Sequence, residues 1–529
     1  MATTYDVVVI GGGHNGLVHA GYLARAGRKV LVLESRPVLG GAAVTEEIIP
    51  GFRFSVFSYV VSLLRPEIIR DLDLVRHGLE ILPLDGTFTP LEGNYLWRVD
   101  DHTRTRREIA RFSAADAEAY EDFGRAMVRV CRFVRPFLGA AAPDPTSFSL
   151  GDLERLLWLA RRYQALDSED KFQLALLSTS SAVDFLDRWF ETDPLKATMS
   201  ASGIIGTFLG VRSPGTAYVL LHHYMGEIDG TFRAWGFSRD GTGGLSRAIA
   251  FGAQAAGAEI RTEARVAKIL VRDGRAEGVA LESGEEIRAS AVSSSLDPRQ
   301  TFLRLMDSGD LPAEFAENIR RYKFRGSSGK VNLALDALPE FTCLPGVGSH
   351  LRGAISISPS VEYMERAYDD AKYGRFSRQP YVDVVIPTLT DPQLAPPGKH
   401  VMSCFVQYAP YQLAQGSWDA RREEFGDAVI NAIARFAPNL PNIILGRQVL
   451  TPLDIERMTG LSEGNIFQGE LSPEQLFFQR PVGGWAKYRT PVRDLFLCGS
   501  ATHPGGGIMG APGRLAALEI LKKSPGKGA

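Results

Sequence analysis

The feature that most constrains the fold of this chain is a glycine-rich turn between an apolar strand and a helix near its start. Residues 7–10 read as a buried strand, residues 17–26 as a helix, and residues 29–34 as a second strand that ends in an acid. The turn between the first two carries the spacing Gly11-x-Gly13-x-x-Gly16. Together these segments predict a βαβ unit of the Rossmann type, which binds a dinucleotide at the N-terminus of its helix.

Each part of this unit has a physical role toward a pyrophosphate. Glycines let the backbone approach the phosphates, and the free N–H groups and dipole of the helix N-terminus favour negative charge. Glu34 is placed to accept hydrogen bonds from ribose hydroxyls and would repel a 2′-phosphate. A second glycine pair and two small residues follow this acid. They offer the backbone another close approach to the pyrophosphate, and this continuation favours FAD over NAD. The predicted cofactor residues of this stretch are Ser35, Arg36, Gly40, Gly41, Ala42 and Ala43.

A second glycine-rich segment lies near the other end of the chain. Residues 495–500 read as a buried strand that leads into glycine, and residues 509–514 open a helix that runs to about residue 521. We expect this helix N-terminus to face the negative charge that develops on a flavin, while Gly499 gives the ribityl chain close access. The predicted cofactor residues here are Gly499, Ser500, Met509 and Gly510.

Because the two cofactor segments lie far apart in sequence, the domains are expected to interleave. We predict an α/β fold in which a Rossmann-type FAD-binding domain alternates with an α+β substrate domain. The FAD-binding domain comprises residues 1–85, 238–300 and 480–529, and the substrate domain comprises residues 86–237 and 301–479.

Alternating apolar and polar residues predict a small β-meander over residues 259–295, with turns at Asp273-Gly274 and Ser283-Gly284. Val266 lies in its first strand, where the backbone could pass beside an adenine, although a core valine fits the pattern equally well. In the substrate domain we expect helices over residues 114–189, strands at 330–335, 381–386 and 400–408, and a helix near 421–436.

Composition excludes several classes of function. A chain of 529 residues with 45% hydrophobic and 23% charged residues is an ordinary globular protein with more than one core. Its net charge of -2 gives no electrostatic case for nucleic acid as a partner. The four cysteines are scattered, so neither a disulfide framework, a zinc site nor the cysteine pair of a disulfide reductase follows.

No secretory leader precedes the first strand, and no apolar run has the length of about 20 residues that spans a bilayer. We therefore expect an intracellular protein, either cytoplasmic or peripherally associated with a membrane. Two stretches, residues 127–138 and 153–163, mix apolar residues with three arginines each. Either could lie on an anionic membrane surface, or be an internal helix with a solvated basic face.

Three motifs resemble those of the phytoene-desaturase-type flavoproteins: residues 11–16, 40–51 and 499–510. Residues 62–66, 219–223 and 450–456 extend the resemblance over almost the whole chain. The flavin-dependent carotenoid ketolases are similar at a greater distance. The resemblance implies an amine-oxidase/phytoene-desaturase-like architecture, non-covalently bound FAD and an apolar, isoprenoid-like substrate. For a eukaryotic member it implies the mitochondrial matrix.

The chain has no second complete glycine fingerprint for NAD(P). Reduced flavin would therefore pass its electrons to oxygen, a quinone or a protein. We expect an FAD-dependent desaturase or dehydrogenase of an apolar molecule. The alternatives are an oxygenating ketolase and a flavin-binding interaction protein without turnover, and the oligomeric state is left open.

The catalytic base stays unassigned. His503 lies nearest to the flavin segment in sequence, but a histidine that bonds the local backbone explains it as well. His222, His223 and Glu227 are too few for a metal site and point to pocket polarity or core hydrogen bonds. Three aromatic residues nearby either line an apolar tunnel or belong to the core: Phe232, Trp235 and Phe237.

Overall fold

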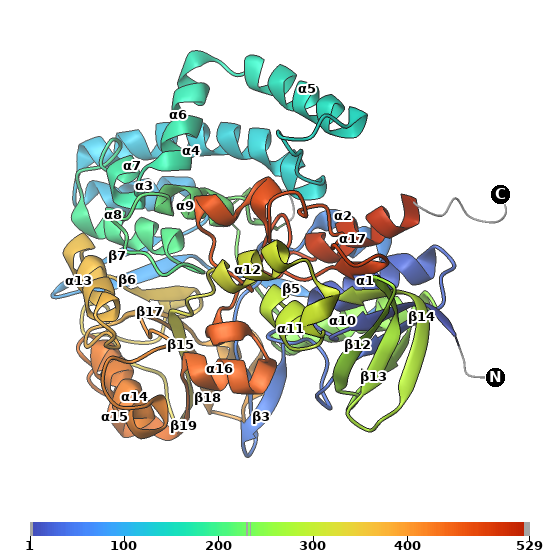
Figure 1. The fold of residues 1–529 in the computed structure, drawn as a ribbon. Helices are drawn as coiled ribbons and strands as arrows, with labels where there is room; N and C mark the ends of the chain where they lie inside the picture. The colour runs from blue at the N-terminus through green and yellow to red at the C-terminus, as the bar shows by residue number, and fades with distance from the viewer. Residues whose placement is uncertain (1–3, 229–230, 233, 523–529) are drawn as a thin grey trace.

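The computed structural model describes residues 4–228, 231–232 and 234–522, which build two seven-stranded sheets with helices around them (Figure 1). In the first sheet, β1, β2, β11, β14 and β20 run parallel, β13 pairs antiparallel with β14, and β12 pairs antiparallel with β13. Its strands are β1 (Tyr5–Ile10), β2 (Val30–Leu33), β11 (Glu259–Arg261), β12 (Val266–Arg272), β13 (Arg275–Leu281), β14 (Glu286–Ser294) and β20 (Leu495–Leu497).

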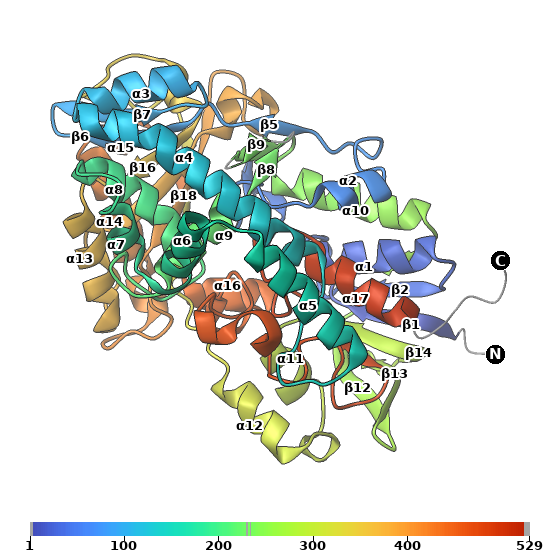
Figure 2. The same cartoon turned by 90° about the horizontal axis from the view of Figure 1, so that it is seen from above.

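Both faces of this sheet are covered, which explains why residues 7–10 of β1 are an unbroken apolar run. Helices α1 (His14–Arg25), α10 (Thr242–Ala255) and α17 (Ala511–Lys522) lie side by side over one face (Figure 2). Val7 and Val9 pack toward these helices, while Val8 and Ile10 pack toward the opposite core under α11 (Pro298–Leu303) and α12 (Ala313–Arg321). The first and last helices of the chain thus share one core.

The second sheet has the strand order β19-β15-β18-β17-β16-β6-β7. Because side chains alternate along a strand, Val331, Val382 and Cys404 face helix α14 (Trp418–Ala434). Lys330, Asp383 and Phe405 therefore lie on the opposite face of the sheet. Its strands are β6 (Thr87–Leu91), β7 (Asn94–Arg98), β15 (Ser328–Leu335), β16 (Ala354–Ile357), β17 (Tyr381–Val385), β18 (His400–Gln407) and β19 (Ile444–Leu450).

A group of helices covers the far end of this sheet, at the top of Figure 1. Several begin at a serine or aspartate whose side chain accepts a backbone N–H of the first turn, as Ser113, Ser149, Asp167 and Ser181 do. These caps end the loops between them and set the helix starts. The helices are α3 (His102–Ala110), α4 (Ala114–Val134), α5 (Leu150–Gln164), α6 (Ser168–Thr179), α7 (Ala182–Leu186), α8 (Asp193–Ser200) and α9 (Thr216–Tyr224).

Short elements join these parts: β3 (Thr45–Ile49), β4 (Phe52–Ser55), α2 (Pro66–Asp71), β5 (Ile81–Pro83), β8 (Glu227–Ile228), β9 (Thr231–Phe232), β10 (Gly236–Ser238), α13 (Val361–Lys372), α15 (Leu440–Ile443) and α16 (Pro452–Thr459). The strands of the first sheet come from residues 5–33, 259–294 and 495–497, and those of the second from residues 87–98 and 328–450. Within the described ranges, no helix combines the length and the apolar character that crossing a bilayer requires.

Two of the sequence predictions are changed by the structure. The last strand of the predicted meander, β14, lies beside β1 and joins the meander to the Rossmann sheet. Residues 127–138 do not offer an apolar membrane face, because Met127, Val130, Phe133 and Val134 are buried in the helical core. Only the second of the two arginine-containing stretches is exposed.

Candidate functional site

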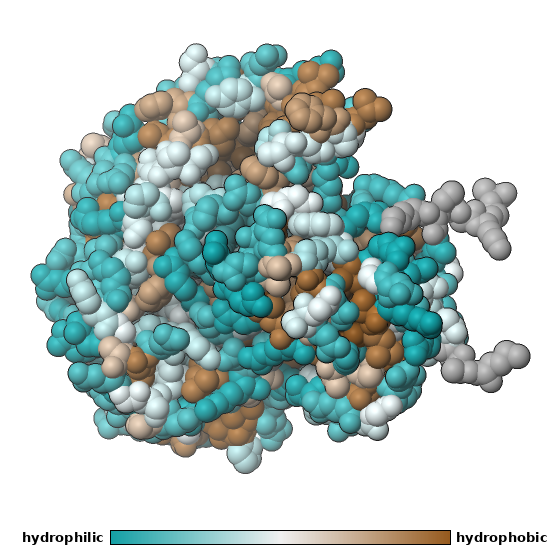
Figure 3. Space-filling model, viewed as in Figure 1, coloured by the Kyte–Doolittle hydropathy of each residue, from teal (hydrophilic) through white to brown (hydrophobic). Residues whose placement is uncertain are grey.

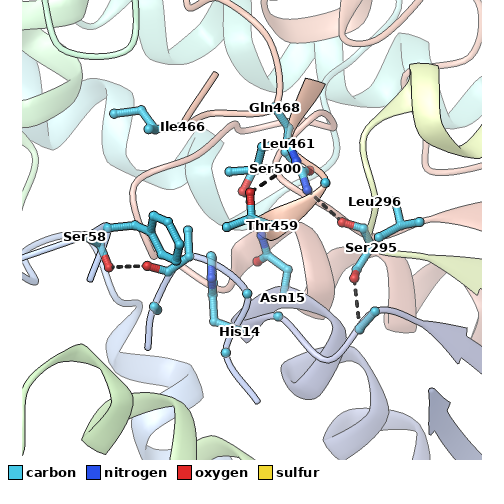
Figure 4. A pocket seen from close by; sticks show the side chains of 18 of the residues that line it. His14, Asn15, Ser58, Ser295, Leu296, Thr459, Leu461, Ile466, Gln468 and Ser500 are labelled. Carbon is cyan, nitrogen blue, oxygen red and sulfur yellow. Dashed lines mark hydrogen bonds between the residues drawn. The ribbon is translucent and has the colours of Figure 1, made fainter. Parts of the chain in front are cut away.

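A cavity of about 520 Å³ lies at the carboxyl ends of β1 and β2, between residues from the two ends of the chain (Figure 4). This is the edge at which open α/β sheets bind their ligands. Eleven of the residues predicted to contact the cofactor line it: Gly11, Gly13, Glu34, Ser35, Arg36, Gly40, Gly41, Ala42, Ala43, Val266 and Ser500.

The glycine turn of residues 11–16 and the glycine pair of residues 40–41 contact each other at the base of the cavity. The Gly40 N–H donates to the Gly12 carbonyl at 2.8 Å, and Gly13 forms an isolated bridge with Gly40. A β-carbon on Gly13 would meet only the Cα of Gly41, at 3.9 Å, so a side chain there would extend into the cavity. Gly41 has a φ of +61°, a left-handed conformation that favours glycine. The floor is therefore bare backbone, as close approach of a pyrophosphate requires.

The carboxylate of Glu34 is fixed at the end of β2. It accepts the N–H of Gly12 at 2.8 Å and the N–H of Arg36 at 2.9 Å, and Ser35 donates its hydroxyl at 3.2 Å. These contacts orient an acid at the position where a ribose hydroxyl donates in dinucleotide folds.

Several buried polar atoms around the cavity have no protein partner. They are Nε2 of His14, Oδ1 of Asn15 and one terminal guanidinium nitrogen of Arg36, whose other terminal nitrogen binds Glu46 at 2.7 Å. Burial lowers the pKa of His14 to about 4, so this imidazole is neutral at pH 7. Buried polar atoms without partners are costly, and a polar dinucleotide would satisfy donors and acceptors of this kind. The residues present therefore fit FAD.

Four predicted cofactor residues do not line the cavity. A β-carbon on Gly16 would lie 2.2 Å from the Gly11 carbonyl, and one on Gly499 would lie 2.4 Å from the Ser295 carbonyl. Gly510 similarly packs against Ile68. Met509 is fully buried in the helical core. These residues let backbone segments pack closely around the cavity, and Gly507 and Ile508 line it from the C-terminal segment in their place.

The C-terminal segment is held in place by a buried arginine that the sequence did not single out. Arg480 is fully buried and donates hydrogen bonds to five backbone carbonyls, among them Ser500 at 3.0 Å and Phe467 at 2.9 Å. Beside it, Gln468 donates to the Ser295 carbonyl at 2.8 Å and accepts the Ala501 N–H at 3.1 Å. The other carbonyls bound by the guanidinium belong to Gly469, Glu470 and Gln475.

The histidines have structural contacts. His503 lies 2.9 Å from the Phe137 carbonyl through Nε2 and does not line the cavity, which favours the structural interpretation. His222 contacts the Gly506 carbonyl at 3.3 Å, and His223 contacts the Val219 carbonyl at 3.0 Å. Glu227 lies beyond the end of α9 and pairs with Arg135, so it does not share a helical face with His223.

Aromatic rings also line the cavity. Tyr59 and Phe405 stack with their ring centres 5.6 Å apart, and Trp235 stacks on His223 at 6.0 Å. Phe237 instead belongs to the core, and the side chain of Phe232 lies outside the described part of the structure. Of the two predicted aromatic residues whose side chains are described, Trp235 lines the cavity and Phe237 does not.

A second cavity, of about 310 Å³, adjoins the first. Val60, Ile205 and Trp235 line both, so they form the wall between them. Asp383 lines the second cavity and accepts the hydroxyl of Tyr59 at 2.6 Å. Burial raises the pKa of Asp383 to about 6.

Lys330 is buried next to Tyr59. Its Nζ donates to the carbonyls of Ser55 and Phe57 at 3.1 and 3.2 Å and lies 5.2 Å from the ring centre of Tyr59. Lys330 thereby holds the segment that carries Tyr59 against the second sheet. A lysine inside a buried, largely apolar strand was the sequence signal for this contact.

We expect the wild type to gain stability with rising pH relative to a Lys330→Met variant. Burial lowers the folded pKa of Lys330 from 10.5 to about 7. Between these values the unfolded chain binds more protons, so the free energy of unfolding of the wild type rises across this interval. Thermal unfolding of both proteins over a pH series measures the difference. Parallel pH profiles would contradict the assignment.

The fold and the cavity define a flavin-dependent oxidoreductase. Residues 16–521 match the family described as flavin containing amine oxidoreductase, and the chain belongs to this family. It is an FAD-dependent oxidoreductase with the predicted Rossmann-type FAD-binding architecture. The chain is 44% identical to mouse (Mus musculus) pyridine nucleotide-disulfide oxidoreductase domain-containing protein 2, over 98% of this chain and 93% of that protein.

Two further similarities cover nearly the whole chain. One subunit of the limonene dehydrogenase of Castellaniella defragrans is 28% identical over 98% of this chain and 94% of its own length. The structure of cyclohexylamine oxidase from Brevibacterium oxydans matches with a TM-score of 0.57 and 17% identity, over 99% of this chain and 100% of that one. The second similarity concerns the fold alone.

Proposed function

We propose that the protein is a dehydrogenase or desaturase that removes a hydride and a proton from an organic substrate and passes the electrons to oxygen, a quinone or a protein. The observation that carries this proposal is the second cavity, which adjoins the cofactor cavity at Val60, Ile205 and Trp235 and provides room for a substrate beside the cofactor. The similarity to a subunit of a limonene dehydrogenase supports carbon–hydrogen oxidation.

Bound FAD supplies the hydride acceptor, and the chain supplies position, shielding and proton handling. The stacked rings of Tyr59 and Phe405 and the half-buried ring of Trp235 orient the substrate and limit the access of water. Asp383 lines the second cavity, and its pKa of about 6 suits a proton acceptor near neutral pH. The hydroxyl of Tyr59 fixes one of its oxygens at 2.6 Å. Asp383 is therefore our candidate base.

The proposal is tested by mixing the FAD-loaded protein, without oxygen, with a panel of isoprenoids, fatty acyl compounds and amines. Loss of the oxidised-flavin absorbance with one member, together with a product that lacks two hydrogens, is the expected result. Failure of the whole panel with FAD firmly bound would contradict the proposal. Incorporation of oxygen into the product in air would identify a ketolase instead.

We also propose that helix α5 lies on an anionic membrane surface. Phe148 and Leu150 are 90% and 80% exposed, and Leu153, Leu157 and Trp158 extend this apolar surface along the helix. The patch is visible over α5 at the top of Figure 3. Arg161 is exposed on the same helix and can meet lipid phosphates. A salt bridge from Lys487 to Asp152 ties the helix to the FAD-binding part.

Liposome flotation tests this contact. We expect the wild type to float with vesicles that contain anionic lipid, and a Leu150→Glu, Leu157→Glu double variant to remain at the bottom. Val347→Glu is the matched control, because Val347 is 76% exposed away from α5. Absence of the wild type from the floated fraction would exclude the membrane role.

A further inference from the structure

The second cavity contains a buried charge for which the described residues supply no counter-ion. Arg98 is the last residue of β7, and its alternation with Trp97 directs it away from the α14 core, toward the helices. Its exposed fraction is 6%, and Nε and one terminal nitrogen have no hydrogen-bond partner. Among the described residues, no carboxylate forms an ion pair with it. The guanidinium lines the cavity that adjoins the flavin site.

Such an arrangement is costly unless a ligand completes it. An arginine stays charged at any physiological pH, and a buried charge without a partner destabilises the fold. Burial lowers the pKa of Arg98, which is the direction expected for an uncompensated cation. The tyrosines around it, Tyr120, Tyr224 and Tyr381, line the same cavity and are neutral at pH 7 because burial raises their pKa values. They offer hydroxyls but no negative charge.

The acids that line the second cavity do not act as counter-ions of Arg98. Asp383 is bound to Tyr59, on the side that faces the flavin cavity, and burial raises its pKa to about 6. Asp100 lines the cavity near the exposed His102, and burial raises its pKa as well. Neither forms an ion pair with Arg98 within the described structure. The described residues therefore supply no negative partner for Arg98, and a bound anion would provide one.

We infer that the second cavity is a carboxylate-binding subsite, in which Arg98 holds the acid group of the substrate while its oxidisable carbon lies toward the flavin. The guanidinium fork matches a carboxylate in shape and charge. The cavity volume of about 310 Å³ suits a small organic group. The second cavity shares lining residues with the cofactor cavity, so the two ends of such a molecule can lie one in each cavity. This inference rests on the proposed function and narrows its organic substrate to an amphipathic carboxylic acid.

The test uses the FAD-loaded protein and calorimetric titration with octanoate and 3-phenylpropionate, each compared with its primary amide. We expect the acids to bind more tightly than the amides. Arg98→Met should weaken binding of the acids by about 10- to 100-fold and leave the amides unchanged. Arg104→Met is the matched control, because Arg104 is exposed on the neighbouring helix α3.

A second readout separates ligand binding from a structural role. Without ligand, Arg98→Met should melt at the same temperature as the wild type or higher, because it removes an uncompensated buried charge. Octanoate should then raise the melting temperature of the wild type and not that of the variant. A variant that melts well below the wild type without ligand would show that Arg98 is structural, and would overturn the inference.

Other outcomes are equally decisive. Equal binding of acids and amides to the wild type would overturn the inference even if the variant did not fold. Chloride or inorganic phosphate that binds as tightly as octanoate would show that the site holds a free anion only. Acid-selective binding without flavin reduction by any acid would leave the subsite standing and count against the proposed dehydrogenation. Flavin reduction by substrates without an acid group, at undiminished rates in Arg98→Met, would support the proposed dehydrogenation and count against the carboxylate subsite.

Discussion

Replacing Gly13 with leucine is expected to abolish FAD retention while the protein still folds. The β-carbon of the added side chain meets only the Cα of Gly41 within 4 Å outside the adjoining residues, and Gly13 lines the cavity, so the side chain is expected to extend into the cavity and not into the core. There it occupies the space where a pyrophosphate approaches the helix N-terminus. We expect the flavin content of the purified variant to fall below about one-tenth of the wild-type value.

The flavin content is measured as the amount of flavin per chain that heat denaturation releases. Gly309→Leu is the control, because a β-carbon there meets no atom within 4 Å and Gly309 is exposed in the short 3-10 helix Ser308–Asp310, outside the cofactor cavity. The control should keep its FAD. Full occupancy in the Gly13 variant, with an unchanged melting temperature, would show that the cofactor does not lie over this turn.

Removing the guanidinium of Arg480 is expected to have the largest effect on stability. Arg480→Met leaves the carbonyls of Phe467, Gly469, Glu470, Gln475 and Ser500 without these donors in the interior. An unsatisfied buried group costs about 1–3 kcal/mol, and the loss of a hydrogen-bond network is among the most destabilising changes known. We expect the free energy of unfolding to fall by about 3–5 kcal/mol.

The same substitution should weaken FAD binding, because Phe467, Gln468 and Ser500 line the cofactor cavity. Chemical denaturation and flavin content are measured on the same preparations. Arg378→Met is the matched control, since the side chain of Arg378 is 82% exposed in its ion pair with Asp370. If Arg480→Met unfolds at the wild-type denaturant concentration, the burial cost of the guanidinium offsets its hydrogen bonds and the account of this loop is wrong.

The parts of the site that sequence predicted best are those governed by local chemistry. The turn from Gly11 to Gly16 and the acid at Glu34 occupy fixed offsets within one βαβ unit, so their positions follow from a short stretch of chain. The same holds for the C-terminal strand and helix. Their assignment as cofactor contacts remains a prediction, and the structure changes its detail at Gly16, Gly499, Met509 and Gly510, which pack against backbone or core.

The substrate side was missed because its residues come together only through the second sheet. Lys330, Asp383 and Phe405 lie on three strands and share a face because of strand alternation and register, neither of which a single sequence reveals. Arg98 ends a strand, where an arginine normally reaches solvent, and here the helical part covers it. Arg480 lies in irregular chain before Pro481, without any periodic signal. An apolar substrate was therefore expected, whereas the second cavity contains charged and hydroxyl groups.

The direction of electron flow is the central claim: electrons enter from an organic substrate in the second cavity, and not from a pyridine nucleotide. The chain carries one complete dinucleotide fingerprint and scattered, unpaired cysteines. The most direct test is to add NADH or NADPH to the FAD-loaded protein without oxygen and to follow the flavin absorbance. We predict that the oxidised spectrum persists with either nucleotide. Rapid and complete bleaching by NADH or NADPH would contradict the account.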